Sequence, residues 1–430
     1  MKQKLIVLSA DALVHEDMEH FKTLPNFKKY LAGGACVEKV RSIYPTITYC
    51  CHATMASGVY PEKHGLAGNL QFIPGASPLP WHWFYDSLRF KESIFKSAKQ
   101  AGLTTAAIYW PTTGNNPYID YLIDEYWTQS PDDTIPDCYA RSGSSPEIVD
   151  IIRSHMDGIT LRKHPECDDF IIACTVDIIR KFDPDVIFIH PANIDDARHH
   201  TGVFSPAVTA AVEKTDEWIG KLMAAEEENG NADITNFVLT SDHGQQNITR
   251  ALNMNVFFAD KGYIRTNPDG SLKDWDVYSL SGGMSALIYL KDKENKKLYN
   301  EVYEMLKAMA EEGLYGFTSV FTKAEFNALH LDGDFSFVLE SDGYTSFGDK
   351  WTRPLVIDRN NSDDYRLGAA THGYLPENGP QPVFYAKGPG FKENVTLENG
   401  RLIDEAPTYA KLLGVEIPGT QGIAMEELLK

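Results

Sequence analysis

Four short runs constrain the fold of this chain, because each one ends in, or leads into, residues that commonly bind metal ions. KLIVLSAD, DVIFIHPANIDDARHH and FVLTSDHG contain apolar stretches typical of buried strands, and GAATHGY is a glycine-flanked segment further along. Polar side chains at the carboxyl ends of parallel strands meet at one edge of an α/β sheet. The residues expected to converge there are Asp11, Asp195, His199, Asp242, His243 and His372.

The pattern along the chain predicts the architecture around these residues. Strand-like and helix-like segments alternate over 1–250, which is typical of a mostly parallel sheet with helices on both faces. We therefore predict an α/β protein built as a three-layer α/β/α sandwich. Residues 251–364 have short strands, one helix and polar connections, and we interpret them as an inserted cap or lid region. The sheet pattern returns in 365–430, so 1–250 and 365–430 form the predicted catalytic core.

Local signals support several of these elements. KESIFKSAKQAGL has the spacing of an amphipathic helix that ends at Gly102, and the strand-like TTAAIYW follows it. Ser205 and Pro206 stand at the start of a long helical pattern, where a serine cap and a proline in the first turn are favourable. Both helices are therefore expected to cover the sheet.

The charge balance excludes two classes of partner. The formal net charge is −20, which argues against a nucleic-acid polymer or an anionic membrane as the main partner. A small phosphate ester remains compatible, because bound metal ions reverse the local sign of the field. The N-terminal apolar stretch is too short for a signal peptide, and the six cysteines contain no C-x-x-C pair. We expect a cytoplasmic protein without a membrane span; the oligomeric state is left open.

The Asp and His residues form a set that favours metal binding. Asp195 and His199 have the spacing D-x-x-x-H, which places both side chains on one face of a helical turn. Taken singly, Asp11 also fits an ordinary turn and His372 an ordinary buried histidine. Together, three carboxylates and three imidazoles favour two divalent ions, with Zn²⁺ as the best match and Mn²⁺ or Fe²⁺ as alternatives.

A nucleophile is expected in RSIYPTITYCCHATMASGVYPEKHGLAGN. Neither Cys50 nor Cys51 is followed six residues later by the arginine that a cysteine phosphatase requires, and the C-x-P-x-R or S-x-P-x-R signature of a sulfatase is absent. A hydroxyl activated by a metal ion remains. Composition and spacing leave Thr46 and Thr48 both open, and each also fits a capping or turn role.

Taken together, the motifs resemble the alkaline phosphatase superfamily, and most closely its nucleotide pyrophosphatase/phosphodiesterase (type I phosphodiesterase) family. YPTITYCCHATMASGVYPEKHGLAGN is similar to the nucleophile segment of that family, and KSAKQAGLTTAAIYWPTT resembles its helix–strand–turn element. DDARHHTG, SDHG and ATHGY match its metal-binding motifs, and PVFYAKGPGF with APTYAKLLGVEIPG resembles its last strand and helix. The resemblance implies an alkaline-phosphatase-like fold; residues 251–364 are covered by no motif.

The resemblance also implies residue roles. Thr48 would be the nucleophile that forms a phosphothreonine intermediate, and the Asn69 side chain, with the backbone N–H of Tyr49, would contact phosphoryl oxygens. One metal ion would be held by Asp11, Thr48, Asp242 and His243, and the other by Asp195, His199 and His372. With two divalent ions, three carboxylates and a Thr48 alkoxide, the site is near neutral and accepts an anionic substrate.

Departures from the family pattern fall in the expected substrate pocket. His190 stands where the family often has a tyrosine that stacks on a nucleobase. Tyr49 stands where phenylalanine is common, and Trp110 is the last residue of the strand-like TTAAIYW, in the segment IYWPTT. We predict that His190, Tyr49 and Trp110 contact the substrate, although packing roles for Tyr49 and Trp110 stay open.

The predicted function is hydrolysis of phosphodiester or pyrophosphate bonds in a small phosphate ester. A phosphomonoesterase or phosphonate hydrolase on the same scaffold is the main alternative. A monoester carries more negative charge and usually needs an added cation, which Arg41, Arg198 or Arg366 would supply from positions near the motifs. A non-enzymatic phosphate-ester binding protein is disfavoured, because all six metal-type residues and Thr48 are present.

Overall fold

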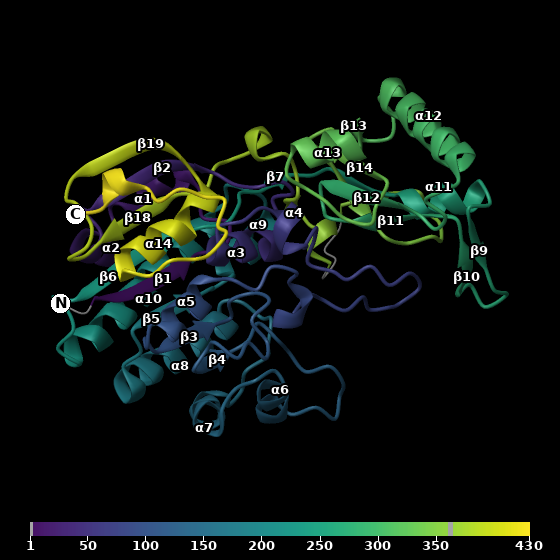
Figure 1. Cartoon of the computed structure of the whole chain (residues 1–430). Helices are drawn as coiled ribbons and strands as arrows, with labels where there is room; N and C mark the ends of the chain where they lie inside the picture. Colours follow the sequence, from purple (N-terminus) through teal and green to yellow (C-terminus); the bar gives the residue numbers. More distant parts are fainter. Residues whose placement is uncertain (1–2, 360–363) are drawn as a thin grey trace.

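The centre of the molecule is an eight-stranded sheet with helices on both faces (Figure 1). The computed structural model describes residues 3–359 and 364–430. Strand β18 runs antiparallel to both of its neighbours, and the other neighbouring strands are parallel, which confirms the predicted α/β class and mostly parallel sheet. From edge to edge the strands are β19 (Val395–Arg401), β2 (Ala35–Arg41), β18 (Phe384–Lys387), β6 (Thr235–Thr240), β1 (Lys4–Ser9), β5 (Val186–Ile189), β3 (Thr105–Ile108) and β4 (Tyr121–Ile123).

Strand β1 lies inside the sheet and is covered on both faces. Leu5 and Val7 belong to one apolar cluster, and Ile6 and Leu8 belong to another on the opposite face. This double burial explains why the strand is a nearly continuous apolar run. The first cluster includes α3 (Thr48–Ser57), α5 (Ile94–Gln100) and α14 (Glu405–Leu413), and the second includes α1 (Met18–Phe21), α2 (Pro25–Tyr30), α7 (Pro146–His155), α8 (Glu166–Phe182) and α10 (Pro206–Glu228).

The two local helix signals are confirmed. The Ser205 hydroxyl accepts a hydrogen bond from the backbone N–H of Val208, and Pro206 is the first residue of α10. Gly102 follows α5 with φ +81°, a left-handed conformation that glycine adopts without the strain a side chain brings. The start of α10 and the end of α5 therefore fix where the chain turns between each helix and the sheet.

The strands between residues 250 and 358 form sheets of their own. One sheet has four strands, another has three, and a hairpin extends beyond them. In Figure 1 these elements lie at the end of the molecule opposite the two chain termini. Their role as a lid stays a prediction, and residues 360–363 of the predicted cap, like residues 1–2 of the predicted core, lie outside the described residues. The elements are β8 (Arg250–Asn253), α11 (Met254–Asp260), β9 (Ile264–Thr266), β10 (Leu272–Trp275), β11 (Val277–Ser281), β12 (Ser285–Leu290), α12 (Lys296–Glu312), β13 (Phe317–Thr322), α13 (Lys323–Ala328), β14 (Phe337–Ser341), β15 (Thr345–Gly348) and β16 (Val356–Asp358).

Short elements close the core around the edge of the sheet. The pair β7 (Gln246–Asn247) and β17 (Ala370–Thr371) is antiparallel, so the segment after β17 lies beside the segment after β6. The remaining short helices are α4 (Pro61–His64), α6 (Ile135–Arg141) and α9 (Asn193–Thr201). In the described part of the chain, no helix is long and apolar enough to cross a membrane.

Candidate active site

The candidate metal ligands lie where three neighbouring strands of the sheet end. Asp11 follows β1, Asp242 and His243 follow β6, and Asp195 and His199 lie on α9, which follows β5. Since β1 lies between β5 and β6, these ends meet at one edge of the sheet. His372, which comes from a distant part of the sequence, reaches the same place through the β7–β17 pair.

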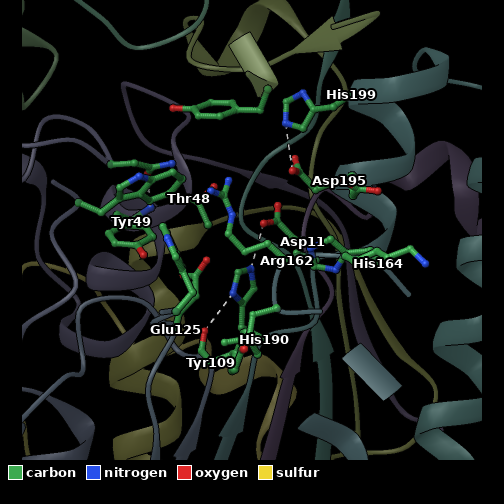
Figure 2. Close-up of a pocket in the computed structure, with 18 of the residues that line it drawn as sticks. Asp11, Thr48, Tyr49, Tyr109, Glu125, Arg162, His164, His190, Asp195 and His199 are labelled. Atoms are coloured by element: carbon green, nitrogen blue, oxygen red, sulfur yellow. Dashed lines mark hydrogen bonds and ion pairs between the residues drawn. The ribbon is translucent and has the colours of Figure 1, made fainter. Parts of the chain in front are cut away.

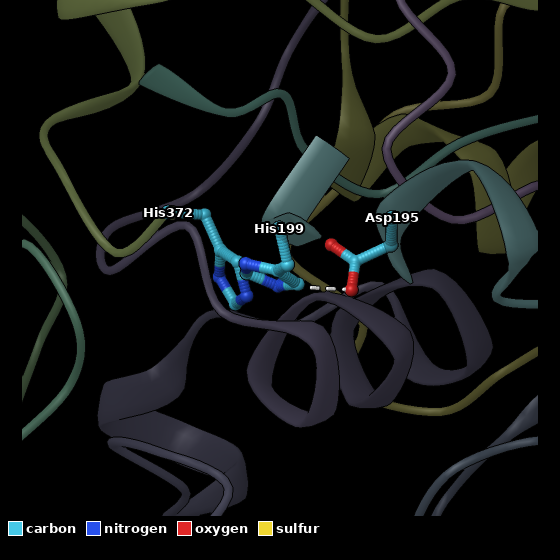
Figure 3. A group of neighbouring side chains, drawn as sticks. All are labelled: Asp195, His199 and His372. Atoms are coloured by element: carbon cyan, nitrogen blue, oxygen red, sulfur yellow. Dashed lines mark ion pairs between the residues drawn. The ribbon is translucent and has the colours of Figure 1, made fainter. Parts of the chain in front are cut away.

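The six residues form two compact groups of three. In each group, ligand atoms lie within 4.8 Å of one another, and Figure 3 shows the group that contains Asp195. The His243 and His372 rings, one from each group, stack with centroids 4.0 Å apart. The two groups are therefore adjacent. They are Asp11 with Asp242 and His243, and Asp195 with His199 and His372.

Their hydrogen bonds leave the expected ligand atoms unused. His199 Nδ1 lies 2.7 Å from the backbone carbonyl of Ala370, and His372 Nδ1 lies 2.9 Å from that of Thr46. A ring that donates through Nδ1 presents the Nε2 lone pair, which is the arrangement of a metal-binding histidine. Asp11 Oδ1 and Asp242 Oδ2 are buried and lack a hydrogen-bond partner among the described residues, and His199 Nε2 faces the ligand carboxylate of Asp195 at 3.0 Å. These unsatisfied atoms fit divalent metal ions.

The pKa shifts of these residues also favour metal binding. Burial, with the nearby charges of Asp195 and Asp242, raises the pKa of Asp11 well above its usual value. Burial also lowers the pKa of His243 to about 4 and that of His372 to about 3. Neutral imidazoles suit metal ligation, whereas neighbouring buried carboxylates are unfavourable without a cation. A bound divalent ion would offset that cost.

Thr48 lies against the first group of ligands. It is the first residue of α3, and its hydroxyl oxygen is 3.2 Å from His243 Nε2. The N-terminus of a helix favours negative charge, because its backbone N–H groups point outward. His52, one turn later, lies with Nδ1 2.9 Å from the Thr48 carbonyl and Nε2 3.0 Å from the Ser9 hydroxyl. The start of α3 is therefore tied to the end of β1.

The resemblance implied that Asn69 and the backbone N–H of Tyr49 both contact phosphoryl oxygens, but in the structure these two groups bind each other. The Tyr49 N–H donates a hydrogen bond of 3.0 Å to Asn69 Oδ1, so it is already used within the protein. This bond fixes the side-chain amide and leaves Nδ2 as the donor that can face a ligand. Asn69 lines the cavity beside Thr48, as its predicted role requires.

A cavity of about 730 Å³ opens over the two groups. Figure 2 shows Thr48 and Tyr49 on one side of it and Asp195 and His199 on the other. Several residues of its wall were not predicted from the sequence: Trp81, Glu125, Trp127, Arg162, His164 and Tyr365. They lie on loops and helix ends outside every motif, so no spacing in the sequence marks them.

Of the three predicted substrate contacts, Tyr49 and His190 line the cavity and Trp110 does not. Both His190 nitrogens are engaged, with Nε2 3.0 Å from Asp11 Oδ2 and Nδ1 3.1 Å from the Tyr109 carbonyl. His190 thus supports a metal ligand, which leaves its ring poorly suited to stack on a base. Trp110 is 1% exposed and packs on His52 below the site. The prediction for Trp110 is wrong, because the turn after β3 folds its indole under α3.

The three arginines considered for a monoester do not line this cavity either. Arg41 pairs with Glu377 at the surface, and Arg366 pairs with Asp349 and Asp364. Arg198 is fully buried, and its guanidinium is bound by Asp17 and two backbone carbonyls. The basic residues that line the cavity come instead from an unpredicted loop: Arg162, Lys163, which pairs with Glu166, and His164, which pairs with Asp168.

Comparisons with known proteins identify relatives in sequence and in fold. The human ectonucleotide pyrophosphatase/phosphodiesterase family member 5 is 25% identical over 422 residues, which cover 96% of this chain and 75% of that protein. Venom phosphodiesterase 2 of Crotalus adamanteus is 23% identical over 99% of this chain, which spans 47% of the venom protein. The structure of the murine ectonucleotide pyrophosphatase/phosphodiesterase 5 superposes with a TM-score of 0.68 at 20% identity and full coverage of both chains.

The family assignment rests on a match that extends through the core and the inserted region. Residues 5–375 match the family described as type I phosphodiesterase / nucleotide pyrophosphatase. This range holds both ligand groups and Thr48. The shared fold with the murine structure agrees with it. The chain therefore belongs to the type I phosphodiesterase/nucleotide pyrophosphatase family of hydrolytic enzymes, within the alkaline phosphatase superfamily.

Proposed function

We propose that this protein hydrolyses phosphodiester or pyrophosphate bonds with two divalent metal ions and a covalent phosphothreonine intermediate at Thr48. The observation that carries the proposal is the position of the Thr48 hydroxyl, 3.2 Å from His243 Nε2, where the two ligand groups adjoin. A serine or threonine hydroxyl is a weak nucleophile and needs an activating group at this distance.

The residues divide into two ligand sets. Asp11, Asp242 and His243, with the Thr48 oxygen, would hold one ion, and the second group would hold the other. The donors are nitrogen and carboxylate oxygen, for which Zn²⁺ is the best match and Mn²⁺ or Fe²⁺ are alternatives. Bound there, the ions supply positive charge that lowers the pKa of the Thr48 hydroxyl and offsets the charge of the phosphate.

The chain's own groups then perform two displacements. The Thr48 oxygen attacks phosphorus, the bond to the leaving oxygen breaks, and the Asn69 amide donates to a phosphoryl oxygen as negative charge develops. Water next attacks the phosphothreonine and the bond to the Thr48 oxygen breaks, so one ester or anhydride bond is hydrolysed. Since each displacement inverts phosphorus, the overall reaction retains its configuration.

A small nucleotide is the proposed substrate class. One murine structure of the same fold, with a TM-score of 0.69, is an inactive threonine-to-alanine variant in complex with AMP. That variant supports a catalytic threonine in the family fold, and the complex supports a nucleotide. In this chain Tyr49, Trp81 and Trp127 form an aromatic wall of the cavity, against which a planar group such as a nucleobase can pack.

The proposal is tested by comparing kcat/KM for bis-p-nitrophenyl phosphate and p-nitrophenyl phosphate on zinc-loaded protein. We expect a strong preference for the diester, because a near-neutral site accepts its single charge more readily than the greater charge of a monoester. A preference for the monoester would place the protein with the phosphomonoesterases, with Arg162 as the added cation. Turnover of neither ester, with both ions bound, would contradict the proposal.

A further inference from the structure

Arg162 is the least expected residue of the cavity wall. It lies on the loop that joins α7 to α8, and its backbone has φ +67°, a conformation that residues with a side chain adopt only rarely. Residues in such conformations concentrate at functional sites, where the surrounding structure holds them. In Figure 2 the Arg162 side chain extends into the cavity, toward the side on which Thr48 and Tyr49 lie.

Two tryptophans hold the Arg162 guanidinium. It lies 4.5 Å from the ring centroid of Trp127 and 5.3 Å from that of Trp81. A planar guanidinium over an indole is held by cation–π attraction, and its N–H groups remain free at the edge. The side chain is therefore oriented without being neutralised by these contacts.

Within residues 3–359 and 364–430, no carboxylate forms an ion pair with Arg162. Its neighbours on the loop differ, because Lys163 pairs with Glu166 at 2.8 Å and His164 pairs with Asp168 at 2.7 Å. The acid that shares its wall is Glu125, whose pKa burial raises to about 8 against the opposing charge of Arg162. Among the described residues of this loop, Arg162 is the cation without a paired carboxylate, so its charge is available to a ligand.

A second cavity of about 470 Å³ adjoins the first, and Arg162 lines both. Trp81 and Tyr365 are the other residues that the two cavities share. The far wall comes from the inserted region, with Tyr278 and Trp351. Arg162 therefore stands at the junction between a chamber over the metal groups and a chamber beside the inserted region.

Charge decides what this arrangement can bind. Two divalent ions, three carboxylates and the Thr48 alkoxide balance one another, so the ligand groups suit the single charge of a diester. A second phosphate next to the scissile one brings further negative charge that needs a cation outside the metal groups. Arginine suits this task, since its fork of N–H donors matches two phosphate oxygens.

We propose that Arg162 is a specificity-determining residue that binds a second phosphate of the substrate, and that the adjoining cavity receives the organic group attached to it. This inference rests on the proposed function and narrows it to pyrophosphate-linked substrates with an organic group at each end. Such a substrate is hydrolysed between its two phosphates, with one phosphate over the metal groups and the other at Arg162.

The test compares three substrates on zinc-loaded protein: the p-nitrophenyl ester of thymidine 5′-monophosphate, ADP, and diadenosine diphosphate. Arg162→Ala is expected to lower kcat/KM for both pyrophosphates relative to the p-nitrophenyl ester by about tenfold or more, as loss of a charged hydrogen bond predicts. Arg162→Lys should restore part of the loss, because it returns the charge without the planar fork. Trp351→Ala should lower kcat/KM for diadenosine diphosphate relative to ADP.

Arg153→Ala is the matched control, since it removes a nearby arginine on α7 that pairs with Asp150 and lines neither cavity. This control should leave kcat/KM for the pyrophosphates, relative to that for the p-nitrophenyl ester, within about twofold of the wild-type value. The inference is overturned if Arg162→Ala leaves kcat/KM for the pyrophosphates, relative to that for the p-nitrophenyl ester, unchanged. An equal loss of kcat/KM with all three substrates would overturn it too. In both cases the proposed function still stands. Absence of turnover with every substrate by wild-type protein would overturn the proposed function itself.

Discussion

The Gln245 amide donates two hydrogen bonds to Asp195, at 2.5 Å to the carboxylate and at 3.0 Å to the backbone carbonyl. Gln245 follows Asp242 and His243 by only a few residues, so one chain segment provides ligands to the first group and support to the second. The bond uses Asp195 Oδ1 and leaves Oδ2, which lies 3.0 Å from His199 Nε2, as the ligand atom.

We therefore predict that Gln245→Ala weakens metal binding at the second group alone. Loss of a bond that orients a ligand typically costs about 10- to 100-fold in metal affinity. Titration with Zn²⁺, followed by the metal content of the dialysed protein, should show one tight site and one weakened site. Gln246→Ala is the control, because that amide bonds to the Asn378 carbonyl instead. Two unweakened sites in Gln245→Ala would refute the positioning role.

A second prediction separates the two tryptophans near the site. Trp110 is buried between His52 and Phe188, so Trp110→Ala should lower the free energy of unfolding by about 3–5 kcal/mol. Trp81 lines the cavity, so Trp81→Ala should raise KM for a nucleotide ester at a smaller cost in stability. Urea unfolding and steady-state kinetics measure both effects.

The milder variant Trp110→Phe serves where Trp110→Ala does not fold. It should destabilise the protein while KM stays within about twofold of the wild type, because Trp110 does not line the cavity. A large rise in KM for this variant, with little loss of stability, would reinstate Trp110 as a substrate contact.

A third prediction concerns the pH dependence of stability. Glu405 is fully buried, and burial raises its pKa to about 8 although hydrogen bonds from Thr240 and Tyr409 oppose the shift. The folded state therefore keeps a proton that the unfolded state releases near its usual value of 4.5. Stability from this group is present at low pH and is lost as pH rises toward 8, by at most ~1.4 kcal/mol per pH unit.

Glu405→Gln should remove this part of the slope, because an amide does not titrate. Chemical unfolding between about pH 5 and about pH 8 measures the slope as the change in free energy of unfolding per pH unit. Glu398→Gln, at an exposed position of β19, should leave the slope as it is. An unchanged slope in Glu405→Gln would show that Glu405 is already ionised in the folded protein.

The sequence predicted the parts of the site that lie on regular elements. Asp11 and Asp242 follow buried strands with apolar centres, so both their existence and their shared edge of the sheet could be inferred. The D-x-x-x-H spacing placed Asp195 and His199 on one face of a turn, and α9 provides that turn. These positions depend on local periodicity, which a single sequence contains.

The cavity wall depends on contacts between distant segments and could not be predicted. Trp81 and Arg162 come together from loops 81 residues apart, and neither loop has a periodic pattern. Gln245 follows a motif, but its partner Asp195 is 50 residues earlier. Trp110 was predicted to contact the substrate because it stands at the end of a strand. The turn that follows directs its indole into the core instead. Side-chain direction in loops is set by tertiary packing, which spacing does not encode.

The role of Thr48 as the nucleophile is tested most directly by comparing Thr48→Ala with Thr46→Ala. Sequence reasoning left both threonines open, and the structure separates them: Thr48 lies 3.2 Å from His243 Nε2, whereas the Thr46 hydroxyl donates to the Tyr374 carbonyl at 2.9 Å. The measurement is single-turnover hydrolysis of bis-p-nitrophenyl phosphate together with metal content. We predict that Thr48→Ala loses activity by on the order of 10³-fold or more with both ions still bound, while Thr46→Ala remains active. Full activity in Thr48→Ala with both ions bound would contradict this role.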